Sequence, residues 1–146
     1  MNAPSSGRVF FTDRDLGKQF PARLREAGLQ VERHADHFAP DTADEVWLTE
    51  VGRRGWIVLT HDARIRYKPN ELAAVMHHRV AMLVVQGRAP YPQLAQWFVQ
   101  TLSGVETFVA THRPPYIAKV QRPSPKELAL RPDAPGRVVP WVPAHR

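Results

Sequence analysis

The chain has 146 residues, 43% of them hydrophobic, which allows one globular domain with a substantial core and hardly a second. Cysteine is absent, which excludes disulfides and thiolate metal sites, and no signal-peptide pattern or membrane-length apolar run is present, so we expect a cytoplasmic protein. The formal net charge of +6 favours a polyanionic partner such as nucleic acid.

Strands and helices are predicted to alternate along the first half of the chain. Residues 1–7 are small and polar, and we expect them to be disordered. Apolar runs indicate strands, and 3.6-residue periodicity indicates helices. In order, we expect a strand over 8–12, a helix over 18–27, an edge strand over 29–33, a loop over 34–40, a helix from a cap at Asp41 or Thr42 to about Arg53, and a buried strand over 56–60.

The second half continues this alternation up to residue 120. A basic loop over 63–69 leads to a helix over 71–78 and a buried strand over 80–85. A helix from about Pro92 to 102, a further helical segment over 105–111 and an edge strand over 116–120 follow. Residues 121–146 are basic and rich in proline, so we expect a disordered tail. The pattern predicts an α/β three-layer sandwich over 8–120 with a central, mostly parallel sheet of four to five strands.

Acidic residues follow two of the predicted strands. The runs Val9-Phe10-Phe11-Thr12-Asp13 and Trp56-Ile57-Val58-Leu59-Thr60-His61-Asp62 are apolar and close in Thr and Asp. In parallel sheets the carboxyl ends of the strands meet at one edge, where functional residues gather. Asp44 lies on the inward face of the helix between these strands, and Glu45 lies about 100° round the helix from it.

Three clustered carboxylates repel one another and commonly hold a cation or a proton. Their hard oxygen ligands select Mg²⁺ or Mn²⁺, ions that activate water and brace a phosphodiester. The basic loop after Asp62 would lie where a phosphate backbone must pass. Taken singly, each aspartate also suits a helix cap or a turn, which is the simpler interpretation of Asp15, and capping is the simpler role for Glu71.

The succession of motifs resembles the PIN-like domains, in particular the compact subgroup of VapC-type toxins and Mut7-C-like proteins. The resemblance covers residues 8–120 in order and spacing. It depends on Asp13 after the first strand, Asp44-Glu45 at the start of a helix, and Thr60-His61-Asp62 after the central strand. Relatives often carry a further acid where this chain has Arg64.

The resemblance implies a Mg²⁺- or Mn²⁺-dependent endoribonuclease, often the toxin of a type II toxin–antitoxin pair. The expected partners are RNA and a cognate antitoxin protein, with a homodimer allowed and no membrane contact. The implied metal ligands are Asp13, Asp44 and Asp62. Glu45 is the alternative to Asp44 in the catalytic set, Thr60 matches a hydroxyl residue of the family, and Glu71 could substitute as a ligand. Thr60, Arg64, Arg66 and Lys68 are the expected substrate-binding residues.

Two other functions are left open. A degenerate PIN-like module that binds RNA or protein without cleaving it is favoured by Arg64 in place of an acid. The spacing of Asp13 and Asp15 also resembles that of haloacid-dehalogenase phosphatases, which require a later acidic pair after another strand. The residues after the strand ending at Val85 offer no such acids, so this hypothesis ranks below the nuclease.

Overall fold

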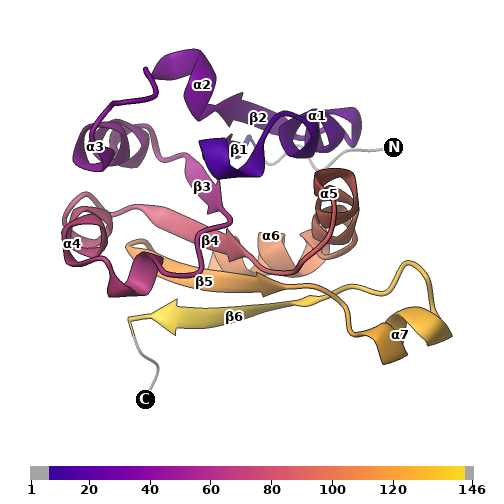
Figure 1. Ribbon diagram of the computed structural model, residues 1–146. Helices are drawn as coiled ribbons and strands as arrows, with labels where there is room; N and C mark the ends of the chain where they lie inside the picture. Colours follow the sequence, from indigo (N-terminus) through magenta and orange to yellow (C-terminus); the bar gives the residue numbers. More distant parts are fainter. Residues whose placement is uncertain (1–6, 144–146) are drawn as a thin grey trace.

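The structure is a computed structural model that describes residues 7–143 (Figure 1). The disorder expected over residues 1–7 therefore falls, except for Gly7, outside the described residues. The described strands form one six-stranded sheet in the order β2-β1-β3-β4-β5-β6. They are β1 (Val9–Thr12), β2 (Gln30–Arg33), β3 (Ile57–Thr60), β4 (Ala81–Val85), β5 (Tyr116–Gln121) and β6 (Arg137–Val142). The predicted α/β class is confirmed, with one strand more than the four to five expected.

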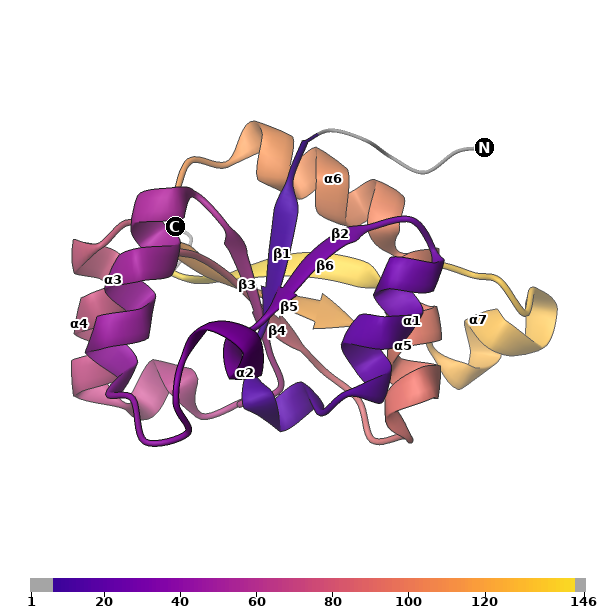
Figure 2. The same ribbon diagram turned by 90° about the horizontal axis from the view of Figure 1, so that it is seen from above.

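Helices cover both faces of the sheet, as predicted for a three-layer sandwich. Figure 2 shows α3 and α4 together on one side and α1 and α5 on the other. The helices are α1 (Gln19–Glu26), α2 (His34–His37), α3 (Asp44–Arg54), α4 (Pro69–His77), α5 (Tyr91–Gln100), α6 (Leu102–Thr111) and α7 (Pro125–Leu130), with short 3₁₀ helices η1 (Arg14–Leu16) and η2 (Ile65–Tyr67). No helix among residues 7–143 is long and apolar enough to cross a membrane.

The central strands are buried on both faces, which explains their continuous apolar sequences. Every residue of β3 and of β4 is buried. Side chains alternate between two cores, so Phe10 packs with α1, α5 and α6 whereas Phe11 packs with α3 and α4. Burial of each such large apolar side chain contributes about 1.5–3 kcal/mol. The two cores fix the parallel strands β1 and β3, whose ends carry the acidic residues.

The prediction of a disordered tail after residue 120 is wrong for the described part of that segment. A capping box between Ser124 and Glu127 starts α7, and β6 then pairs antiparallel with β5. Pro140 obscured this strand in the sequence, since proline interrupts a ladder of hydrogen bonds. It is tolerated here because β6 is an edge strand with one side unpaired.

Two local predictions in the first half of the chain are also wrong. Residues 34–40 were expected to be a loop, but α2 occupies His34–His37. The helix expected to start at a cap at Asp41 or Thr42 begins at Asp44 instead, after Ala43, whose side chain makes no capping hydrogen bond. The later start places Asp44 and Glu45 in the first turn of α3, where the helix dipole favours acids.

Candidate active site

The pairing of β1 with β3 brings two of the predicted acidic residues to the same edge of the sheet. The strands are parallel neighbours, with Thr12 in register with Leu59. One step further, the Asp13 amide donates a hydrogen bond to the Leu59 carbonyl oxygen at 2.9 Å. Asp13 and Asp62 therefore both leave the carboxyl edge of the sheet, as the sequence predicts.

The Thr60 hydroxyl connects the acidic groups at this edge. Its Oγ1 lies 3.2 Å from Asp13 Oδ2 and 3.0 Å from Asp15 Oδ2, and it accepts a hydrogen bond from the Asp62 amide at 3.2 Å. A hydroxyl has one hydrogen to donate, so the two carboxylates compete for it. Thr60 is only 2% exposed, which favours a role in orienting these acids over the predicted contact with substrate.

Asp15 is a member of this group that the sequence analysis missed. Its expected role as the cap of the helix that follows is wrong, because Lys18 is the N-cap residue of α1, no side chain caps that helix, and Asp15 lies inside η1. Both carboxylate oxygens of Asp15 instead lie 3.1–3.2 Å from the His61 amide. The Asp-x-Asp spacing after an apolar strand is the signal in the sequence that could have placed Asp15 in this group.

Burial, and to a smaller extent neighbouring carboxylates, disfavour the charged forms of Asp13 and Asp15. Desolvation is the main cause that raises the pKa of Asp13, and desolvation followed by the Asp13 charge raises the pKa of Asp15 to about 6. The Asp15 residue is nonetheless exposed, so solvent reduces the size of this rise in its pKa. Both carboxyl groups therefore hold a proton to higher pH than an ordinary aspartate does.

Asp62 is held by cationic and amide groups of the basic loop that follows it. Lys68 Nζ lies 2.5 Å from Asp62 Oδ2, and the Arg64 amide donates to Oδ1 at 2.9 Å. Burial alone raises the pKa of Asp62, but these hydrogen bonds outweigh burial and lower it below its usual value. Lys68 Nζ also lies 3.7 Å from Glu71 Oε1. The Lys68 ammonium is therefore paired closely with Asp62 and only more distantly with Glu71.

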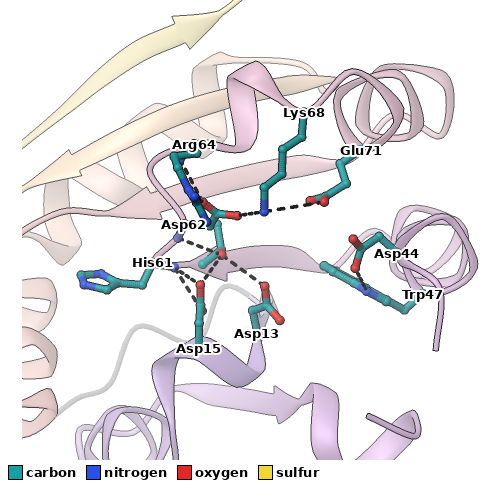
Figure 3. Close-up of polar contacts among 10 residues, drawn as sticks. Asp13, Asp15, Asp44, Trp47, His61, Asp62, Arg64, Lys68 and Glu71 are labelled. Carbon is teal, nitrogen blue, oxygen red and sulfur yellow. Dashed lines mark hydrogen bonds and ion pairs between the residues drawn. The ribbon is translucent and has the colours of Figure 1, made fainter. Parts of the chain in front are cut away.

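The first turns of α3 and α4 contribute the remaining acids. Asp44 Oδ1 accepts a hydrogen bond from Trp47 Nε1 at 2.9 Å, and the carboxylate faces Glu71 across the two helices (Figure 3). Burial and then the proximity of Asp44 raise the pKa of Glu71 to about 7. Glu45 is 75% exposed and points toward His78, with 3.8 Å between Oε2 and Nε2. Of the two alternatives, Asp44 is the one that faces the other acids.

Two neighbouring hollows open beside these carboxylates. A cleft of about 670 Å³ between α3 and α4 is lined by Asp44 and Glu71. A smaller hollow of about 170 Å³ is lined by Asp13, Arg14 and His34. There the Arg14 Nε donates to Nδ1 of the buried His34 at 2.9 Å. Asp13 thus borders one hollow while Asp44 borders the other.

The carboxylate oxygens of these acids suit a hard divalent cation chemically, but they are not spaced to bind one together in this structure. Carboxylate oxygens are the ligands that Mg²⁺ and Mn²⁺ prefer. The pKa values of Asp13 and Glu71 are raised mainly because burial disfavours their charged forms, which a cation would stabilise. However, no three acidic or histidine side chains among the described residues form a group arranged to hold a metal. For Asp62 to become a ligand, its Oδ2 must exchange the Lys68 ammonium for the ion.

Comparison with known proteins adds one match. A family model described as "PIN like domain" matches residues 8–87, which run from β1 past the end of β4. The matched segment contains Asp13, Asp44, Asp62 and Glu71, whereas α5, α6, β5, α7 and β6 lie beyond it. No curated protein and no solved structure matches the chain.

Proposed function

The chain belongs to the PIN-like domain family, and on that premise we propose that it is a Mg²⁺- or Mn²⁺-dependent endoribonuclease. One observation carries the proposal most strongly. Asp13 and Asp62 leave adjacent parallel strands at one edge of the sheet, and the Asp44 carboxylate faces the same region from α3 (Figure 3). Desolvated carboxylates gathered at a sheet edge suit a hard cation and the hydrolysis of a phosphodiester.

In this proposal each residue has a defined task. Asp13, Asp44 and Asp62 would hold the ion through carboxylate oxygens, where it would supply positive charge to activate water and to stabilise charge developing on the phosphate. The Thr60 hydroxyl orients Asp13. Arg64 Nε lies 3.9 Å from Asp62 Oδ1, but its side chain is 82% exposed and can turn to a phosphate group of the substrate.

The charge distribution around the site supports RNA as the substrate. The loop after Asp62 presents the exposed cations Arg64 and Arg66 beside the acids. Cations of this kind attract a phosphate backbone by releasing its counterions. We extend the proposal to the toxin of a type II toxin–antitoxin pair, with a cognate antitoxin as protein partner, on the strength of the sequence resemblance. Growth arrest on expression of the chain, lost in Asp62→Asn, would support this extension.

A module that binds RNA without cleaving it is the second candidate. The observation that favours it is the Asp62–Lys68 ion pair, together with Arg64 where relatives often have an acid. A permanently bound lysine would leave Asp62 unable to serve as a ligand. The two candidates make opposite predictions for cleavage and the same prediction for binding.

Cleavage of a labelled single-stranded RNA by the purified protein separates these candidates. The nuclease proposal expects cutting with Mg²⁺ or Mn²⁺ that is abolished by EDTA and by Asp62→Asn. Asp133→Asn, which changes an exposed acid after α7, is the matched control and should leave cutting unchanged. RNA that is bound but uncut under all these conditions would favour the binding module, and cutting that survives Asp62→Asn would contradict the proposed site.

A further inference from the structure

An aromatic and basic surface lies next to the proposed active site. Its aromatic members are Tyr67, at the end of η2, and Trp141, in β6. The ring centroids are 6.4 Å apart and the ring planes meet at 77°. Tyr67 is 73% exposed, which is unusual for a tyrosine in a folded domain. We call this pair and its flanking cations the Tyr67–Trp141 surface.

Two cations flank the rings of this surface. Lys119 Nζ lies 4.3 Å from the centre of the Trp141 ring, and Arg66 Cζ lies 5.8 Å from it. Within residues 7–143, neither cation forms an ion pair with an acidic side chain, whereas Arg53 and Arg54 are both paired with Glu50. The positive charge of Arg66 and Lys119 therefore remains available to an anionic ligand.

The C-terminal part of the chain creates this surface. Arg66 and Tyr67 lie inside the segment that matches the family model, whereas Lys119 and Trp141 lie beyond it. The antiparallel pairing of β6 with β5 carries Trp141 to the face of the sheet that α3 and α4 cover. Trp141 packs partly against that core, which limits the positions open to its ring. The surface adjoins the loop that runs from Asp62 to Lys68.

We propose that the Tyr67–Trp141 surface binds single-stranded RNA and leads it to the acidic site. A base would stack on the exposed Tyr67 ring, and Arg66 and Lys119 would contact the flanking phosphates. Proteins bind single strands through this combination of stacking platforms and cations. A duplex hides the faces of its bases, so the same surface would discriminate against double-stranded RNA. The inference rests on the proposed function for its choice of ligand.

Binding can be measured separately from cleavage. A fluorescently labelled single-stranded oligoribonucleotide is titrated in EDTA, and its anisotropy is followed. We expect Tyr67→Ala to weaken binding roughly 5- to 100-fold, the range for loss of one stacked base, whereas Tyr67→Trp retains it. Leu130→Ala, which truncates another highly exposed apolar side chain, is the matched control and should bind normally. Thermal melting confirms that each variant is folded.

Arg66 and Lys119 allow a second measurement, the salt dependence of binding. Their replacement would not change this quantity if their role were merely structural. Arg66→Gln and Lys119→Gln should each weaken binding and lower the slope of log affinity against log salt by about 0.7, the value for one phosphate contact on a single strand. Arg131→Gln, at the end of α7, should leave both quantities unchanged.

Several outcomes would overturn the inference. Tyr67→Ala that binds like the unaltered protein, or equal affinity for duplex and single strand, would exclude stacking on Tyr67. Binding of a poly-glutamate peptide with the same dependence on Tyr67 would indicate an acidic protein as the partner instead. None of these binding results affects the outcome of the cleavage assay. Failure of this inference is therefore distinguishable from failure of the proposed nuclease. Tyr67-dependent RNA binding without cleavage would retain the surface and reject the nuclease.

Discussion

Lys68 Nζ lies 2.5 Å from Asp62 Oδ2, so the carboxylate at the end of β3 is already bound to a cation that the chain itself supplies. The same ammonium approaches Glu71 at 3.7 Å. It compensates the charge of two acids that would otherwise repel each other. A divalent ion that uses Asp62 must therefore compete with Lys68.

Removal of Lys68 is predicted to strengthen metal binding. In Lys68→Met the aliphatic part of the side chain is largely kept while the competing charge is lost. An ion pair that is partly exposed contributes up to about 1 kcal/mol, which corresponds to about fivefold in affinity. Mn²⁺ affinity measured by calorimetry should rise by up to this factor. Lys126→Met, an exposed change in α7, is the control, and unchanged or weaker Mn²⁺ binding by Lys68→Met would refute competition.

Thr60→Val tests the shared hydroxyl. Valine preserves the shape of the buried side chain but leaves Asp13, Asp15 and the Asp62 amide without their common partner. Hydrogen bonds to charged groups contribute about 1.5–3 kcal/mol, so the free energy of unfolding in urea should fall by about this amount. Thr60→Ser should recover most of the loss. Thr49→Val, at an exposed position on α3, should change little, and equal effects of the two valine variants would contradict the role of Thr60.

The protonation of Glu71 predicts how stability depends on pH in the absence of metal. Its pKa rises from 4.5 to about 7 on folding, so the folded state holds a proton that the unfolded state has released. The contribution of the protonated form is complete below pH 4.5 and is lost as the pH rises from 4.5 to about 7. Glu71→Gln should flatten this decline, which we expect to be on the order of 2 kcal/mol after solvent screening.

Urea unfolding at a series of pH values in EDTA measures this effect. Glu26→Gln, at an exposed acid that ends α1, is the control and should keep the decline. A decline of the same size in Glu71→Gln would show that another group is responsible. Asp15, whose pKa rises to about 6, adds a decline of the same sign between about pH 4 and pH 6, so Asp15→Asn is the next variant to compare.

Gly136 tests whether the C-terminal segment is an integral part of the fold. A Cβ at this position would lie 1.7 Å from the Gln121 carbonyl oxygen, a distance that only backbone displacement can relieve. Gly136→Ala should therefore separate the start of β6 from β5 and lower the free energy of unfolding by about 2 kcal/mol or more. It should also weaken RNA binding, because β6 carries Trp141.

Gly104 provides the matched control for this change. It lies within α6, and a Cβ there would meet only Val138 Cγ2 at 4.0 Å. Gly104→Ala should stabilise the protein by about 0.5–1 kcal/mol, because alanine has the better helix propensity. If Gly136→Ala were as stable as the unaltered protein, the pairing of β6 with β5 described above would be wrong.

Sequence patterns predicted the elements whose burial is complete and regular. The apolar runs of β3 and β4 have few alternatives to a buried strand, and β1 and β3 therefore delivered Asp13 and Asp62 to one edge as expected. β6 was missed because its edge position leaves its residues only partly buried and tolerates Pro140. A half-exposed strand that contains a proline shows little periodic signal. Its stability depends on pairing with β5, which is distant in sequence from most of the site.

The contacts within the candidate site were less predictable than its location. Asp15 and Thr60 meet across 45 residues, and a pattern of local spacing could not distinguish this contact from a helix cap. Lys68 was expected to contact RNA, but the turn through η2 directs its ammonium back to Asp62. Such contacts depend on how loops fold over the sheet edge, which the periodicity of the strands does not determine.

The metal site is tested most directly by a titration with Mn²⁺ followed by electron paramagnetic resonance. Free Mn²⁺ loses signal when it binds, so the measurement reports occupancy without requiring activity. We predict saturable binding to the unaltered protein, and at least tenfold weaker binding to Asp13→Asn, Asp44→Asn and Asp62→Asn, since each lost carboxylate costs more than ~1.4 kcal/mol in such a site. Asp133→Asn should bind normally. Binding that is absent from the unaltered protein, or equal in all four variants, would contradict a metal-dependent nuclease at these three carboxylates.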